Sequence, residues 1–347
     1  MAKIFNVSGL CRPKKHYIVK LTSRLEEISR MIAAGEYFVI SKARQYGKTT
    51  LLCALAEYLK EDYQVLSLDF QNIESDEFTN GDAFVHALAR EINKRFRRMS
   101  GLSEEVKEKM LYLENCRNHC VRMAEMFACL SQWCGQSEKP VVLVVDEIDT
   151  AANNQVFLDF LAQLRAAYLD SNFTPTFQSV ILAGVYDIRN IRRKLRQDEE
   201  HMENSPWNIE ADFLVDMSFS LDDIEGMLKE YENDHHTGME LNLIAGMIHE
   251  YTSGYPYLVS RFCNYLDERV AGMNGFPDKS SAWTKAGFYE AERMIVKEDN
   301  TLYQSLIRKI ELYPELRSIL YELLFTGKPI PYNATSSYMK SAAMFGI

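Results

Sequence analysis

Short apolar runs alternate along the chain with longer segments in which apolar residues recur every three or four positions. Runs of the first kind predict buried strands, and segments of the second kind predict amphipathic helices. The predicted strands occupy residues 36–40, 63–70, 140–146, 179–184 and 213–215. Because helical segments separate these runs, the pattern favours an α/β fold with a parallel sheet.

The helical periodicity has recognisable end signals at several places. Thr22 or Ser23 can cap the first helix, and Gly35 ends it. Ser220 and Asp223 have the spacing of a capping box at the start of a later helix. The predicted helices occupy residues 22–34, 51–60, 81–97, 154–169, 220–231, 241–251, 314–324 and 336–345, and a further pair lies between residues 100 and 138.

The loop between the first predicted strand and the next helix carries the clearest chemistry. It ends in Gly-Lys-Thr-Thr, as a phosphate-binding loop does. Gly47 lets the backbone approach a phosphate, and Lys48 supplies a point charge for the outer phosphates. Thr49 supplies a hydroxyl for magnesium, while unpaired amides at the helix start attract the anion. The predicted nucleotide-binding residues are Arg44, Gln45, Tyr46, Gly47, Lys48, Thr49 and Thr50.

This loop departs from the usual pattern at Lys42, where the motif normally has a glycine five residues before Gly47. The alternative interpretation is a chance Gly-Lys-Thr at a helix start. The strand–loop–helix context argues against chance. We therefore expect the loop entry to follow a backbone path that an L-residue tolerates.

A second motif follows the apolar run at residues 140–145, which leads directly into Asp146 and Glu147. This pattern predicts a central parallel strand with carboxylates at its C-terminal end, where open α/β sheets bind ligands. Asp146 is predicted to hold magnesium, and Glu147 to orient or deprotonate the attacking water. An acidic loop after a strand is the alternative, but pairing with the Lys48 loop favours catalysis.

The segment after residue 184 holds weaker candidates. Tyr186 and Asp187 follow the fourth predicted strand, where ATPases with a phosphate-binding loop place a residue that senses the γ-phosphate. A run of arginines comes next, and one of them could reach a neighbouring subunit as an arginine finger. A solvated helix face is the alternative interpretation of this run. Its members are Arg189, Arg192, Arg193 and Arg196.

Beyond residue 217 the pattern is helical throughout. Three short helices, the last beginning at Pro256, predict a lid over the nucleotide. Pro256, or Arg261 on the same helix, could contact it. The lead-in residues Tyr17 and Ile18 are candidates for contact with the base, and plain packing is the alternative. Helix, turn and helix near the end predict a winged-helix-like unit. We expect an ATPase domain at 1–217, a lid at 218–275 and a terminal unit at 276–347, with Ile347 marking a truncated end.

Composition adds limits to these predictions. A net charge of −10 over 347 residues argues against a surface coated with nucleic acid, although a local basic face stays open. We expect a reduced cytoplasmic chain, because the sequence has neither a signal-like leader nor a membrane-length apolar run. For one group of residues a zinc site is the alternative interpretation. The group has no Cys-x-x-Cys knuckle, so we favour cysteines that pack on helices as small hydrophobic residues. This group is Cys116, His119, Cys120, Cys129 and Cys134.

The paired motifs, the fourth strand, the Gly254-Tyr255-Pro256 turn and the terminal helical unit together resemble bacterial and archaeal AAA-like ATPases, close to the STAND and Orc/Cdc6-like groups. The resemblance covers nearly the whole chain. It implies an ASCE-type P-loop NTPase with a helical lid, a winged-helix-like all-α C-terminal unit, ATP, and Mg²⁺. By the same resemblance, Lys48 contacts phosphates, Thr49 and Asp146 serve the metal, Glu147 serves the water, and Pro256 lies near the nucleotide.

These observations predict an ATPase that hydrolyses ATP slowly and couples its nucleotide state to the lid and C-terminal unit. A nucleotide-bound scaffold without hydrolysis is one alternative. A DNA-binding regulator is another, and a protein partner or homo-oligomer is compatible with either. A small-molecule kinase fits less well, because such enzymes are shorter and have a different lid. The basic residues available for DNA at the C-terminal end are Lys309, Arg317, Lys328 and Lys340.

Overall fold

The computed structural model describes residues 3–116, 119–185, 207–298 and 301–327, with isolated residues between 329 and 342. The chain folds into two compact units. The sheet unit contains Leu25–Lys42 and Leu52–Val215, and the helical unit contains Met1–Arg24, Ala43–Leu51 and Asp216–Ile347. The units interleave along the chain, and the expected domain boundaries at residues 217 and 275 stay predictions.

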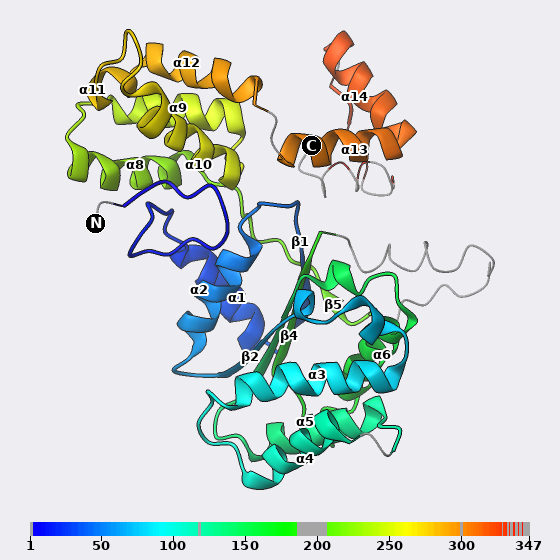
Figure 1. The fold of residues 1–347 in the computed structure, drawn as a ribbon. Coiled ribbons are helices and arrows are strands. Elements are labelled where there is room, and N and C mark those ends of the chain that lie inside the picture. Colours follow the sequence, from blue (N-terminus) through cyan, green and yellow to red (C-terminus); the bar gives the residue numbers. More distant parts are fainter. Residues whose placement is uncertain are drawn as a thin grey trace. The chain divides into compact units, whose positions relative to one another are not determined.

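A parallel sheet forms the centre of the sheet unit (Figure 1). Its strands are β1 (Tyr37–Ser41), β2 (Gln64–Asp69), β3 (Val141–Asp146), β4 (Ser179–Gly184) and β5 (Glu210–Ala211). Their order is β2-β3-β4-β1-β5, and every neighbouring pair is parallel. The predicted α/β fold is confirmed.

The fifth strand lies earlier than residues 213–215, so that part of the prediction is wrong. β5 pairs with β1 through Glu210 and Ala211. Phe213 instead stacks on Phe38, with ring centroids 5.7 Å apart, and Leu214 is 84% exposed. The apolar pattern at 213–215 therefore reflects side-chain packing on the sheet rather than backbone pairing.

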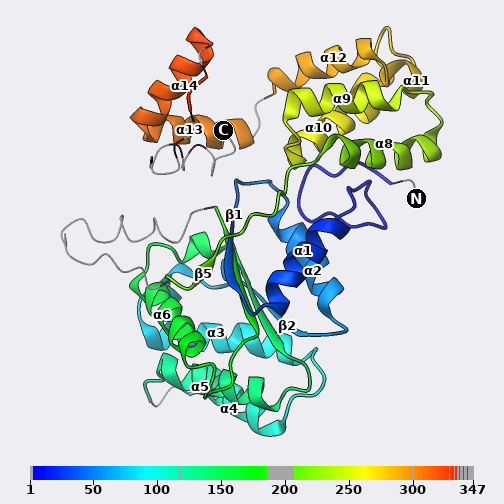
Figure 2. The same ribbon diagram turned by 180° about the vertical axis from the view of Figure 1, so that it is seen from behind.

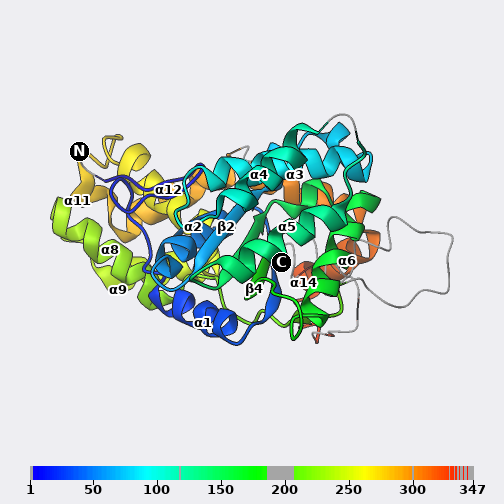
Figure 3. The same ribbon diagram turned by 90° about the horizontal axis from the view of Figure 1, so that it is seen from below.

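Helices cover both faces of the sheet (Figures 1 and 3). They are α1 (Thr22–Ala33), α2 (Lys48–Leu59), α3 (Gly81–Phe96), α4 (Glu104–Asn115), α5 (Met123–Gln136) and α6 (Gln155–Leu169). Side chains alternate along β1, so Tyr37 and Val39 join the core that contains α3, α5 and α6. Phe38 and Ile40, both buried, lie on the opposite face, where α1 and α2 pack.

The helical unit is a bundle with its own aromatic core (Figures 1 and 2). The bundle consists of α8 (Leu221–His235), α9 (Leu241–Thr252), α10 (Pro256–Tyr265), a π-helical turn (Leu266–Val270), α11 (Lys279–Ala282) and α12 (Lys285–Val296). The same unit also contains α13 (Thr301–Leu312) and α14 (Pro314–Thr326). The N-terminal segment packs into this bundle. Tyr17 is 2% exposed, its ring lies 5.2 Å from that of Tyr231, and its hydroxyl donates to Asp234 at 2.9 Å. These contacts favour the packing interpretation of Tyr17.

The helical C-terminal region is also confirmed by α13 and α14. Most of the helix predicted at residues 336–345 lies outside the described residues, as do Lys328 and Lys340. The winged-helix assignment therefore stays a prediction. Among the described residues, no helix combines the length and apolar character needed to cross a membrane.

Two glycines in the helical unit allow a matched test of its packing. Gly254 has φ +71°, and a Cβ atom there would lie 2.1 Å from the carbonyl oxygen of Phe219. Gly238 has φ +74° with open space around it. We expect Gly238→Ala to cost about 1–2 kcal/mol from the left-handed backbone alone. Gly254→Ala should cost about 2–5 kcal/mol, because steric overlap adds to that penalty. Guanidinium unfolding would measure both, and equal costs would contradict the close contact between Gly254 and the Phe219 carbonyl oxygen.

Candidate functional site

The Lys48 side chain folds back onto the predicted phosphate loop. Gln45 and Gly47 have left-handed backbones, with φ of 61° and 82°. Lys48 is the first residue of α2, and its Nζ donates to the carbonyl oxygen of Ala43 at 3.0 Å. Lys48 is only 7% exposed, whereas Thr49 is exposed. The loop thus surrounds a cation and ends at a helix N-terminus, where amides lack intrahelical partners.

The loop entry at Lys42 has a backbone that an L-residue tolerates, because Lys42 is not among the residues with positive φ. Its backbone N–H donates to the carbonyl oxygen of Gly184 at 3.2 Å. Lys42 therefore continues the pairing of β1 with β4 by one bond. The glycine that the motif normally has here is not needed for this path.

Two carboxylates end neighbouring strands of the sheet unit. Asp146 ends β3, Asp69 ends β2, and the two residues are register partners. Because neighbouring residues in a parallel pair share a face, both side chains lie on the face covered by α1 and α2. Burial raises the pKa of Asp69, and the negative charge of Asp146 adds to that shift. Sequence reasoning missed Asp69, although its apolar run also ends in aspartate.

Asp146 lies close to the helix that begins with Lys48. Burial raises the pKa of the Cys53 thiol on α2, and the charge of Asp146 raises it further. Asp146 is 7% exposed, and its Oδ1 accepts the backbone N–H of Glu147 at 2.9 Å. One oxygen of this carboxylate is therefore oriented by the backbone that follows β3.

Glu147 has a strained backbone, with φ 55° and ψ 41°. A left-handed conformation costs a non-glycine residue about 1–2 kcal/mol, and such residues cluster at functional sites. The turn after it, Ile148–Thr150, is held against the end of β4. Asp149 Oδ2 accepts the N–H of Val185 at 2.6 Å, and a Cβ on Gly184 would lie 2.7 Å from Ile148. These contacts hold Glu147 in its strained conformation.

The other predicted residues have varied positions. Pro256 is buried at the first turn of α10. Cys129 is buried in the core of the sheet unit, and Cys116 and Cys134 pack against it as small hydrophobic residues would. No group of three or more metal-ligating side chains occurs among the residues that the structure describes. The sensor candidates Tyr186 and Asp187 and the four arginines after them lie outside the described residues.

Comparison with known proteins identifies the family. The model of the AAA-like domain matches residues 12–338. This chain belongs to the AAA-like domain family. Its P-loop and acidic strand therefore belong to an ATPase-family fold. Among curated proteins, no significant match is found.

Several solved structures have a similar fold. The Walker-type ATPase PABY2304 of Pyrococcus abyssi matches with a TM-score of 0.57 at 14% identity, covering 98% of this chain and 93% of that chain. The ORC2 protein of Aeropyrum pernix, in ADPNP–ADP complexes, matches with a TM-score of 0.50 at 11% identity, covering 99% and 89%. At these identities the similarity shows the fold alone.

Asp149 provides a test of the turn that carries Glu147. Asp149→Ala should lower the free energy of unfolding by about 1.5–3 kcal/mol, because it removes a charged acceptor from a backbone amide. Asp149→Asn keeps an acceptor oxygen and should lower the free energy of unfolding by a smaller amount. Asp159 on α6 is exposed and serves as the control, since Asp159→Ala should change stability by less than about 0.5 kcal/mol. Urea unfolding would measure all three, and equal losses for Asp149→Ala and the control would contradict the assignment.

Proposed function

We propose that this AAA-like protein binds ATP with Mg²⁺ and hydrolyses it slowly, and that the bound nucleotide sets the state of its lid and C-terminal unit. One observation carries the proposal most directly. Asp146 and Asp69 end their strands on the sheet face covered by α2, and α2 begins with Lys48 and Thr49. The helix that begins at the phosphate-binding motif therefore continues, from Leu52 onward, along the sheet face that carries the two aspartates.

The donor set fits magnesium. The Thr49 hydroxyl and the Asp146 carboxylate are hard oxygen ligands, which magnesium prefers while keeping several waters. Asp69 raises the negative charge beside Asp146, and a divalent cation would offset the repulsion between the two carboxylates. Bound Mg²⁺ would neutralise charge on the phosphates.

The chain's own groups divide the remaining work. Lys48 Nζ would exchange the Ala43 carbonyl for phosphate oxygens, and the amides of residues 44–50 would bind the anion around it. Glu147 would orient the attacking water and accept its proton. Its left-handed backbone sets the direction in which the Glu147 side chain leaves the main chain. Pro256, at the start of α10, would lie near the nucleotide as the family resemblance implies.

Two alternatives remain predictions. A scaffold that binds nucleotide without turnover would use the same loop, and Glu147 would then have no catalytic role. A DNA-binding regulator would use the C-terminal end, where the Arg317 guanidinium lies 5.8 Å from the ring centroid of Tyr321. No observation on the described residues favours either alternative over hydrolysis. Oligomeric state and a protein partner are likewise open to measurement.

Nucleotide binding is tested at Lys48. Lys48→Ala should weaken the affinity for Mg·ATPγS at least tenfold, because it removes the cation from the centre of the loop. Lys60→Ala, just beyond the other end of α2, removes an exposed lysine paired with Glu57 and should leave the affinity unchanged. Isothermal titration calorimetry measures both. Equal affinities for the Lys48 variant and the wild type would remove the phosphate-loop assignment.

Hydrolysis is tested at Glu147. Glu147→Gln keeps the shape of the side chain and should lower kcat about 10²–10⁴-fold, while ATP binding persists. Glu108→Gln removes an exposed carboxylate from α4 and serves as the control. Multiple-turnover phosphate release would measure kcat. Wild-type protein that binds ATP but releases no phosphate would support the scaffold alternative.

A further inference from the structure

The phosphate loop is held by a tyrosine from the turn between α9 and α10. Tyr255 is 8% exposed, and its hydroxyl donates to the backbone carbonyl oxygen of Arg44. Its ring meets that of Tyr46 edge-on, with centroids 4.7 Å apart. Ala43 and Leu302 pack in the same small cluster. Residues from both sides of Arg44 therefore contact the turn that begins α10.

The Tyr255 hydrogen bond determines which way one peptide group faces. In a trans peptide the C=O and N–H point in opposite directions. Since the Arg44 carbonyl faces Tyr255, the N–H of Gln45 faces away from Tyr255. Gln45 has a left-handed backbone, as does Gly47, and such sequences of residues direct successive amides into a concave anion site. A carbonyl turned the other way would repel phosphate.

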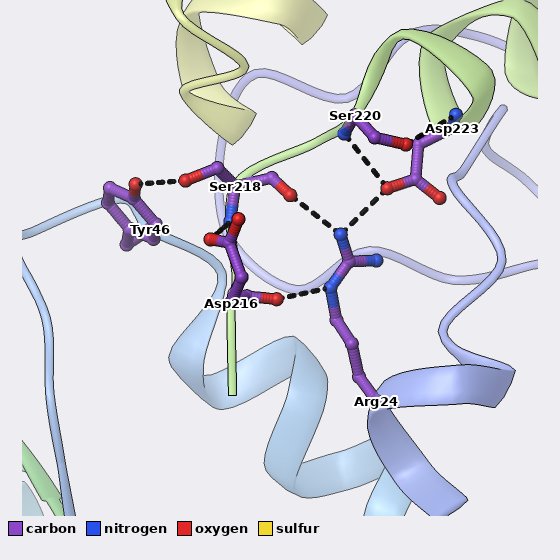
Figure 4. Close-up of polar contacts among 6 residues, drawn as sticks. All are labelled: Arg24, Tyr46, Asp216, Ser218, Ser220 and Asp223. Atoms are coloured by element: carbon purple, nitrogen blue, oxygen red, sulfur yellow. Dashed lines mark hydrogen bonds and ion pairs between the residues drawn. The ribbon is translucent and has the colours of Figure 1, made fainter. Parts of the chain in front are cut away.

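Tyr46 makes a second connection, to the start of α8 (Figure 4). Its hydroxyl lies 2.8 Å from Ser218 Oγ. The Ser218 carbonyl oxygen accepts from Arg24 at 2.6 Å, and Arg24 also pairs with Asp223 at 2.7 Å. Asp223 completes the capping box of α8 with Ser220. The loop is thus tied to a helix start through a chain of polar contacts.

The two connections come from backbone segments that are themselves paired. The N–H of Phe219 donates to the carbonyl oxygen of Gly254 at 2.8 Å. Phe219 follows Ser218, and Gly254 precedes Tyr255. The start of α8 and the turn before α10 therefore form one support for the loop, with the hydroxyls of Tyr46 and Tyr255 at its two contact points.

We propose that Tyr255 and Tyr46 are positioning residues for nucleotide binding, which hold the phosphate loop so that its amides face the phosphates. This inference rests on the proposed function. It adds that the helical unit shapes the loop before nucleotide binds. By linkage, nucleotide binding then stabilises the segments that hold the loop.

If Tyr255 and Tyr46 served only to fill space in the structure, their aromatic rings would be sufficient. Phenylalanine would fill the same space, yet the buried hydroxyl of Tyr255 points at a backbone oxygen of the loop. Burial raises the pKa of Tyr255, with a further contribution from Tyr46, so the hydroxyl keeps its proton in any ordinary assay buffer. The hydroxyl therefore remains a hydrogen-bond donor to Arg44.

The test compares Tyr255→Phe and Tyr46→Phe with Tyr289→Phe, in the full chain. Tyr289 lies on α12 and is 52% exposed. Its variant is the control, because it makes the same chemical change at a residue outside the contacts that support the loop. We expect Tyr255→Phe to weaken binding of Mg·ADP and Mg·ATPγS about three- to tenfold by calorimetry. Tyr46→Phe should weaken it by a similar or smaller factor, and the control should stay within about twofold.

Hydrogen exchange supplies a readout that a structural role would not change. In the wild type, Mg·ADP should slow exchange both in residues 43–50 and in residues 253–258. In Tyr255→Phe, protection should persist in the loop and be reduced at 253–258, with the melting temperature of the free protein within a few degrees of the wild type.

The outcomes separate the two proposals. Wild-type binding together with unchanged affinity and unchanged protection in Tyr255→Phe would overturn this inference and leave the proposed function standing. A lower melting temperature with unchanged nucleotide affinity would also overturn it, because the hydroxyl would then serve stability alone. Wild-type protein that binds neither nucleotide would overturn the proposed function, and this inference with it.

Discussion

Parallel pairing of β2, β3, β4 and β1 is the constraint on which the candidate site depends. Parallel strands end at the same edge, so the pairing brings Asp69, Asp146 and Gly184 to the edge at which β1 ends. Lys42 extends this edge by one hydrogen bond to Gly184. Because the side chains also alternate in register, both aspartates lie on the same face of the sheet. A slip of one residue in β3 would move Asp146 into the apolar core.

Two residues with left-handed backbones lie where chemistry is proposed. Glu147 and Gln45 are two of the described non-glycine residues with positive φ, one after the acidic strand and one in the phosphate loop. Each is held by contacts that do not come from its own segment. The turn that begins at Glu147 is held by Val185 through Asp149, and the loop around Gln45 is held by Tyr255 through Arg44. Supporting contacts of this kind are what allow strained residues to persist.

Local patterns predicted much of this fold. The buried runs gave four of the strands, and the Gly-Lys-Thr loop and the aspartate–glutamate pair are visible in short windows of sequence. The missed features depend on distant parts of the chain. The hydrogen bond from Tyr255 to Arg44 spans 211 positions, and the Asp69–Asp146 pair requires the strand register. Helices α11, α12 and α13 were also missed, although α12 and α13 have an amphipathic pattern and Asp278 and Thr284 cap the starts of α11 and α12.

The interleaving of the two units limits how the protein can be divided. Phe5, Tyr17 and Val19 are buried among side chains of α8, α9 and α12, so the first residues of the chain complete a core built mostly from its second half. A fragment starting near Asp216 would expose that aromatic interior to water. Trimming the N-terminus would damage the same region from the opposite end of the sequence. Folding of the helical bundle therefore requires the N-terminal segment together with residues of α8 to α12.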